Sequence, residues 1–196
     1  MEDQFIAGYY RQVILDFGVR AGETITEDLL EEMDRAELRH LIKDRCFGWL
    51  ARRAHSRKEL LQKALVKKYP EHVIHNVLNE LNDRGFIDDR GFAYAFATDK
   101  AKLYGWGPQK IRSALYQKGV QKRYIDAALS ESVTLDESVA NLYNEVNKAK
   151  NRFIREEELF KRKKKLVDFL YRKGYHLEMI LAEVDSLLDI ISNEEA

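Results

Sequence analysis

The sequence predicts an all-α protein of three tandem three-helix repeats, stacked into an elongated, curved, solenoid-like body with a small N-terminal extension. Two observations support this prediction. Helix breakers are scarce, because the 196 residues include only 10 glycines and 2 prolines, and one pattern of apolar and basic residues occurs three times. Long segments without breakers favour helix. Repeated units with marginal cores gain buried apolar surface by stacking on one another.

The repeated pattern keeps the same internal spacing in all three copies. Two apolar residues four positions apart, which share one helix face, precede a turn that starts with lysine, and a second apolar pair follows. The second copy lies 51 residues after the first, and the third lies 55 residues after the second. The copies are Leu60, Ala64, Lys67-Lys68-Tyr69, Ile74 and Leu78; Ile111, Leu115, Lys118-Gly119-Val120, Ile125 and Leu129; and Leu166, Leu170, Lys173-Gly174-Tyr175, Ile180 and Val184.

Residues 1–35 form the N-terminal extension, which lies outside the repeats. The segment from Phe5 to Phe17 fits a short helix. The alternation around Val13-Ile14-Leu15 makes a small strand pair an alternative, so both remain open. Thr26 is a residue type that caps a further helix.

The first repeat covers residues 36–85 and begins with a helix at about 36–54. Ser56 and Glu59 have the spacing of a capping box, which predicts the start of the second helix. Lys68 occupies the position that glycine takes in the other two copies, so we expect a looser end for that helix.

The second repeat covers residues 86–132 and the third covers 133–196. A helix at about 89–104 opens the second repeat, and Pro108 fits the first turn of its next helix. The capping box of Thr134 and Glu137 predicts where the third repeat begins. Gly119 and Gly174 are expected to have positive φ, because glycine ends helices in the left-handed conformation.

Charge and composition limit the class of partner and the cellular compartment that the sequence favours. Residues 1–40 carry a net charge of −6, residues 41–130 carry +9 and residues 131–196 carry −3. A basic middle segment favours an acidic or nucleic-acid partner. The single cysteine, Cys46, fits a reducing compartment and a small buried side chain. The acidic N-terminus and the lack of a long apolar run predict a cytoplasmic protein without a membrane span.

The sequence offers no residues for catalysis. His72 and His75 lack a third metal ligand, and Asp88 and Asp89 are better placed to begin a helix than to act as a catalytic pair. The run Lys161–Lys165 wraps around a helix, so most of it is expected to face solvent. We therefore predict no catalytic residues, no metal, no cofactor and no enzymatic activity.

Basic residues recur at one place in every repeat, the turn between the second and third helices. Helix-dipole compensation explains one lysine per turn, and a partner-binding strip explains the rest; both interpretations remain open. The predicted partner-binding residues are Lys67, Lys68, Lys118, Lys122, Arg123, Arg172 and Lys173.

The sequence resembles the RecX family of bacterial recombinase regulators over about residues 40–190. The resemblance is carried by LNDRGFIDD from Leu81 to Asp89, by Phe92-Ala93, and by the repeated residues given above. Lys68, where the family usually has glycine, departs from the pattern. Residues 1–35 match nothing in it.

The resemblance implies a protein of tandem three-helix modules that binds the RecA recombinase and its nucleoprotein filament. We expect the protein to be a monomer. Such proteins modulate, and mostly limit, filament growth, ATP hydrolysis, strand exchange and co-protease activity. Weak binding to single- or double-stranded DNA is left open. The alternative function is a helical module that binds single-stranded DNA or RNA without RecA.

Overall fold

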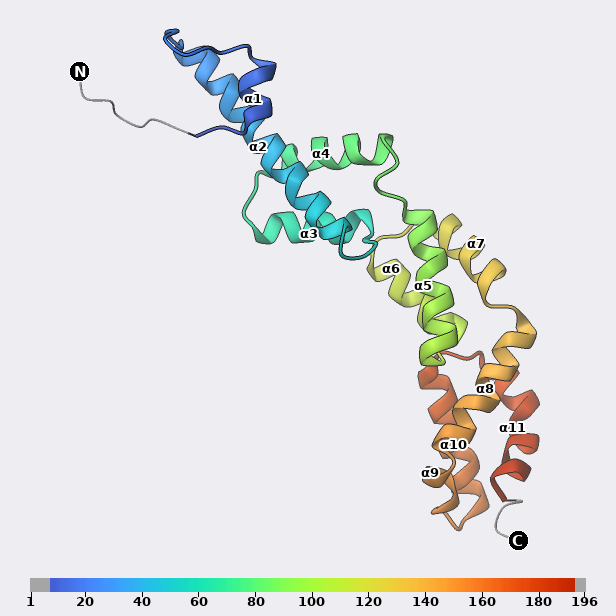
Figure 1. The fold of residues 1–196 in the computed structure, drawn as a ribbon. Coiled ribbons are helices and arrows are strands. Elements are labelled where there is room, and N and C mark those ends of the chain that lie inside the picture. Colours follow the sequence, from blue (N-terminus) through green and yellow to red (C-terminus); the bar gives the residue numbers. More distant parts are fainter. Residues whose placement is uncertain (1–7, 193–196) are drawn as a thin grey trace. The chain divides into compact units, whose positions relative to one another are not determined.

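The computed structural model describes residues 8–192, and every regular element within them is a helix (Figure 1). The all-α prediction is therefore confirmed. Contacts divide the chain into two compact units, Met1–Asp88 and Asp89–Ala196. Over the described range, none of the helices combines the length and the apolar character needed to cross a membrane.

In the described part of the N-terminal extension, the short helix α1 (Arg11–Asp16) packs against α2 (Glu27–Leu50), which begins within the extension. The backbone N–H of Tyr10 donates to the Glu37 carboxylate at 2.7 Å, and Val13 is buried. A strand pair around Val13 is therefore wrong. The helix expected from Phe5 begins only at Arg11 in the described part, and residues 5–7 lie outside the described residues.

The first helix of repeat 1 is longer than expected and differs at both ends. It was predicted at about 36–54, but α2 starts at Glu27 and ends at Leu50. The Thr26 hydroxyl accepts a hydrogen bond from the Leu29 backbone N–H at 3.3 Å, so Thr26 caps a helix as predicted. No glycine or proline follows before Gly48, and the capped helix therefore continues into the repeat.

Repeat 1 joins α2 to α3 (Arg57–Val66) and α4 (Glu71–Asp83). Its core brings together the apolar residues of the sequence pattern, including Leu60, Ala64, Ile74 and Leu78. Cys46 is fully buried in this core, and burial raises the pKa of its thiol to about 11. The cysteine therefore packs as a small apolar side chain, as expected.

Unit 2 contains the other two repeats, and each has a core of its own. Repeat 2 consists of α5 (Asp89–Tyr104), α6 (Pro108–Gln117) and α7 (Lys122–Ser132). Repeat 3 consists of α8 (Leu135–Ala149), the unpredicted single turn α9 (Asn151–Ile154), α10 (Leu159–Lys173) and α11 (Leu177–Ser192). Three separate cores confirm the three-helix repeat. The curvature of the whole chain stays a prediction.

The turn after the second helix of each repeat has one backbone geometry. Lys68, Gly119 and Gly174 have φ of 61°, 75° and 93°, so the positive φ predicted for the two glycines is confirmed. In each turn the next residue donates its N–H to a carbonyl five residues earlier, at 3.5, 3.1 and 3.2 Å in order. A looser helix end was expected at Lys68, and the only sign of it is that the hydrogen bond of this turn, at 3.5 Å, is the longest of the three.

Replacing Lys68 by glycine should stabilise the protein by up to about 1 kcal/mol, because a side chain is disfavoured in the left-handed conformation. Thermal unfolding followed by circular dichroism would measure this. Lys67→Gly is the matched control, since Lys67 has φ of −80° and gains nothing from glycine. Equal or lower stability of the Lys68→Gly variant would contradict the strain at this turn.

Candidate partner-binding surface

The predicted basic residues lie at the three turns between second and third helices. Lys67 and Lys68 follow α3, Lys118 follows α6, and Lys122 and Arg123 begin α7. Arg172 and Lys173 are the last residues of α10. The sequence pattern therefore placed each cation on the right element, but their surroundings differ.

Four of the seven cations face solvent at the turns of repeats 1 and 2. Lys67, Lys68 and Lys122 are exposed, and no ion pair to them is found among residues 8–192. The Arg123 guanidinium lies 4.7 Å from the centre of the Tyr124 ring and donates to its hydroxyl at 3.0 Å. These charges are accessible to an anionic partner.

Lys118 lies against aromatic side chains of its own repeat. Its Nζ is 5.4 Å from the centre of the Phe96 ring and 5.9 Å from that of Phe92. A cation at this distance from a ring face is attracted by the ring quadrupole. Lys118 therefore helps to hold α6 on α5.

Lys173 has its charge compensated inside unit 2. Its Nζ donates to Glu145 at 2.6 Å and to the Tyr104 carbonyl at 3.3 Å. Glu145 is 6% exposed, and burial alone would raise its pKa, but the hydrogen bonds from Lys173 and Lys148 outweigh burial and lower it. Arg172, by contrast, is exposed, and its Nε donates to a carbonyl of its own helix, that of Asp168, at 3.2 Å.

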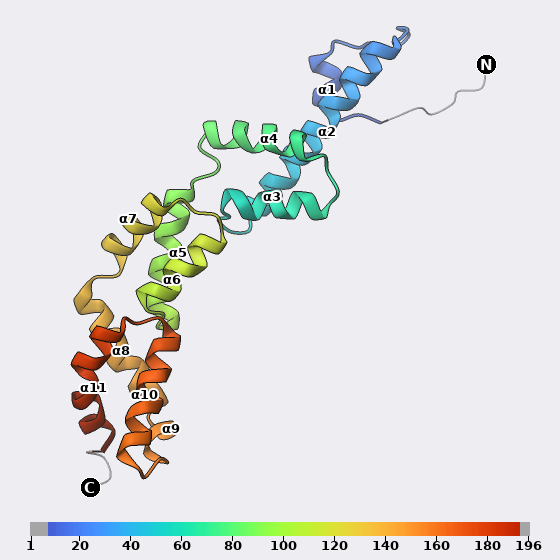
Figure 2. The same ribbon diagram turned by 180° about the vertical axis from the view of Figure 1, so that it is seen from behind.

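The turn of repeat 3 docks on the start of α6, where Figure 2 shows the end of α10 beside the loop between α5 and α6. The Gly107 N–H donates to the Lys173 carbonyl at 2.8 Å, and the Gln109 N–H donates to the Gly174 carbonyl at 3.0 Å. A Cβ on Gly107 would lie 2.3 Å from the Gly174 carbonyl carbon, which leaves room for glycine alone.

This docking fixes the spacing of two basic turns. The turn of repeat 3 lies at the beginning of α6 and the turn of repeat 2 follows its end. A helix of 10 residues spans about 15 Å. Arg172 and the Lys122–Arg123 pair are therefore presented from the two ends of one helix.

A second basic surface in repeat 2 was missed by the sequence reasoning. We call it the aromatic–lysine ladder, and it consists of Phe92, Phe96, Tyr104, Trp106, Lys100 and Lys110. Phe92, Phe96, Lys100 and Tyr104 are spaced by four residues along α5 and so share one face. That spacing was visible in the sequence. Trp106 joins them only because the chain turns back at Gly105, which has φ of 59°.

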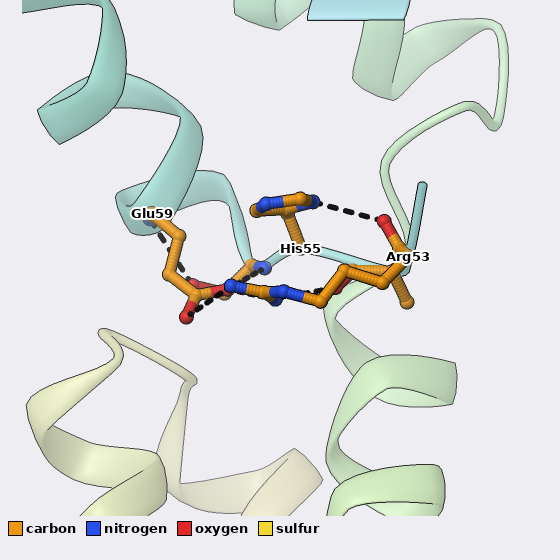
Figure 3. Close-up of polar contacts among 5 residues, drawn as sticks. Arg53, His55 and Glu59 are labelled. Atoms are coloured by element: carbon orange, nitrogen blue, oxygen red, sulfur yellow. Dashed lines mark hydrogen bonds and ion pairs between the residues drawn. The ribbon is translucent and has the colours of Figure 1, made fainter. Parts of the chain in front are cut away.

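The segment between α2 and α3 is held by polar contacts (Figure 3). Arg53 Nη1 donates to the Ala54 carbonyl at 2.7 Å and to Glu59 at 3.0 Å. Glu59 also accepts from the Ser56 N–H at 3.2 Å, while Ser56 caps Glu59 in return. The predicted capping box is therefore present, and Arg53 extends it.

His55 is the buried titratable group of this segment, with 3% of its surface exposed. Its Nδ1 lies 2.9 Å from the Arg53 carbonyl, which places the proton on Nδ1, and its Nε2 is buried without a hydrogen-bond partner in the described structure. Burial lowers the pKa of His55, although the Arg53 carbonyl opposes this.

We expect His55 to make folding acid-sensitive. The folded pKa is below the unfolded value of about 6.5, so its neutral form contributes stability that is present above pH 6.5 and lost as pH falls towards the folded pKa. Between pH 6.5 and 5.5 the loss is at most about 1.4 kcal/mol. Urea unfolding of the wild type and of His55→Gln at both pH values measures it. An unchanged difference between the two proteins would contradict this assignment.

The other chemistry-bearing groups have structural contacts. His75 Nε2 lies 3.5 Å from Glu71, and no group of three metal-ligating side chains occurs among the described residues. Within the basic run, Lys161 pairs with Glu158 and Lys163 with Asp185, both at 2.6 Å. Arg162 is buried and donates to the Glu156 carbonyl at 2.8 Å.

Three family models match the chain in order. They are described as the first, second and third three-helix domains of RecX, and they match residues 43–81, 88–129 and 136–182. These matched ranges fall on repeats 1, 2 and 3.

Individual proteins are similar over most of the chain. A "Regulatory protein RecX" of Chlorobium phaeobacteroides is 34% identical, over 70% of this chain and 87% of that protein. One of Leuconostoc citreum is 28% identical, over 100% of this chain and 72% of that protein. A crystal structure of regulatory protein RecX superposes with a TM-score of 0.77 at 22% identity, covering 88% of this chain and 84% of the other. This likeness shows the shared fold.

Proposed function

Because the chain belongs to the RecX family of regulatory proteins, we propose that it binds the RecA recombinase and the filaments that RecA forms on DNA, and mostly limits their activity. Filament growth, ATP hydrolysis, strand exchange and co-protease activity would fall together, because all of them depend on the filament. The protein would act in the cytoplasm as a monomer, by binding and without catalysis.

The observation that supports the proposal most is that all three family domains occur in order in one chain. A filament presents the same protomer surface again and again. A protein with three similar domains is suited to contact several protomers at once, so that contacts which are weak alone add by avidity.

The charge at the turns supports the same partner. Lys67, Lys68, Lys122 and Arg123 are exposed and project from repeats 1 and 2, and Arg172 adds an exposed cation in repeat 3. A nucleoprotein filament carries phosphates and acidic side chains, which such cations attract. Lys118 and Lys173 would contribute indirectly, by holding their turns in place.

The test is ATP hydrolysis by RecA on single-stranded DNA, with the protein added before or after filament assembly. We expect hydrolysis to fall with increasing protein, and to fall further when the protein is present during assembly. Raising the DNA concentration should not restore hydrolysis. Unchanged hydrolysis would refute the proposal, and full rescue by added DNA would assign the effect to masking of DNA instead.

A further inference from the structure

The aromatic–lysine ladder carries two lysines whose positions are fixed by aromatic rings. Lys100 Nζ lies 3.8 Å from the centre of the Tyr104 ring and 5.2 Å from that of Trp106. Lys110 Nζ lies 4.5 Å from the centre of the Trp106 ring. Trp106 in turn meets Phe96 edge to face, with ring centres 6.3 Å apart. Two ammonium groups are therefore held over one connected set of rings.

These two charges have no carboxylate partner among residues 8–192. Other lysines of unit 2 differ, because Lys148 and Lys173 pair with Glu145, and Lys163 pairs with Asp185. A ring attracts an ammonium group but leaves its net charge in place. The ladder is thus a preorganised pair of positive charges. Because the rings already position both lysine side chains, these side chains lose little further entropy when an anion binds.

The rings of the ladder are also partly open to solvent. Tyr104 is 53% exposed, and Phe96 and Trp106 are half-buried. Lysines beside accessible aromatic rings are the combination that binds single strands, in which phosphates meet cations and unpaired bases stack on rings. A duplex keeps its bases stacked inside and cannot use the rings. An acidic peptide would use the charges alone.

We propose that the aromatic–lysine ladder of repeat 2 binds single-stranded nucleic acid directly, with Lys100 and Lys110 on phosphates and Tyr104 stacked on a base. This activity goes beyond regulation of the recombinase and needs no recombinase. It also lies on residues other than the seven basic residues at the turns.

Trp106 gives a direct signal, because it lies inside the ladder. In a Trp49→Phe background it is the remaining tryptophan of the chain. Titration with an oligothymidylate of about 16 nucleotides should quench its fluorescence to saturation. A duplex of the same length, and polyglutamate of equal charge, should bind more weakly.

Two variants distinguish the contribution of the lysine charges to binding from that of the Tyr104 ring. Lys100→Gln with Lys110→Gln should weaken binding and reduce the slope of log affinity against log salt by roughly 1.4, since each phosphate contact contributes about 0.7. Tyr104→Ala should weaken binding on the order of tenfold and leave the slope unchanged. Lys58→Gln with Lys164→Gln removes the same charge elsewhere and should change neither. Circular dichroism checks that each variant is folded.

The proposal fails if oligothymidylate does not bind the folded protein, or if the Lys58/Lys164 variant is affected as much as the Lys100/Lys110 variant. It also fails if polyglutamate binds as tightly as oligothymidylate and Tyr104→Ala does not change the affinity for oligothymidylate, because the surface would then be a site for acidic peptides. Recombinase is absent from this assay, so its failure leaves the proposed regulation of RecA untouched.

Discussion

Replacing Gly174 by alanine should destabilise unit 2 by about 3 kcal/mol, which combines the cost of a left-handed alanine with that of overpacking. Gly174 has φ of 93°, and a Cβ there would lie 2.4 Å from the Lys110 Cβ and 2.5 Å from the Lys110 backbone nitrogen. A backbone atom cannot swing away as a flexible side chain can. The docking of repeat 3 on α6 must therefore open.

Gly119→Ala is the matched control, since Gly119 ends the equivalent helix with φ of 75°. It should cost only about 1 kcal/mol, the price of the left-handed conformation. Urea unfolding followed by Trp106 fluorescence, in the Trp49→Phe background, reports on unit 2. If the two variants lose equal free energy of unfolding, the close approach of Lys110 to Gly174 adds nothing to the cost of the alanine.

Removing the exposed cations of the first two turns should abolish most of the effect on the recombinase. The variant combines Lys67→Ala, Lys68→Gly, Lys122→Ala and Arg123→Ala, and it spares Lys118 and Lys173, which make internal contacts. Single exposed charges contribute about 1 kcal/mol or less, so the four together should raise the half-inhibiting concentration on the order of a hundredfold. Salt should shrink the difference between variant and wild type.

The control removes four charges away from the turns, at Arg35, Arg39, Arg90 and Lys164, and should inhibit ATP hydrolysis almost as well as the wild type. If the variant that lacks the four cations of these two turns is folded and inhibits normally, the turns are a solvated edge. The contact would then lie on another face, and residues 1–40, with their net charge of −6, would be the next candidate.

The helices and their ends were predictable from sequence wherever the signal is local. The Ser56 and Thr134 caps, Pro108 in the first turn of α6 and the two left-handed glycines each act through backbone groups within a few residues. The predicted start of α2 was wrong because it was taken from the repeat, which suggested a boundary near residue 36. The local signals indicate the observed start, since Thr26 caps the helix and nothing interrupts it after Thr26.

By itself, the sequence determined the helical class, the number of repeats and the turns at which basic residues gather, because spacing along a helix fixes which residues share a face. Only the tertiary structure decided what those residues touch. Lys173 reaches Glu145, 28 residues away, and Trp106 reaches Phe96 by a left-handed turn at Gly105. Which charges are compensated and which are accessible depends on packing between helices, and local spacing does not encode it.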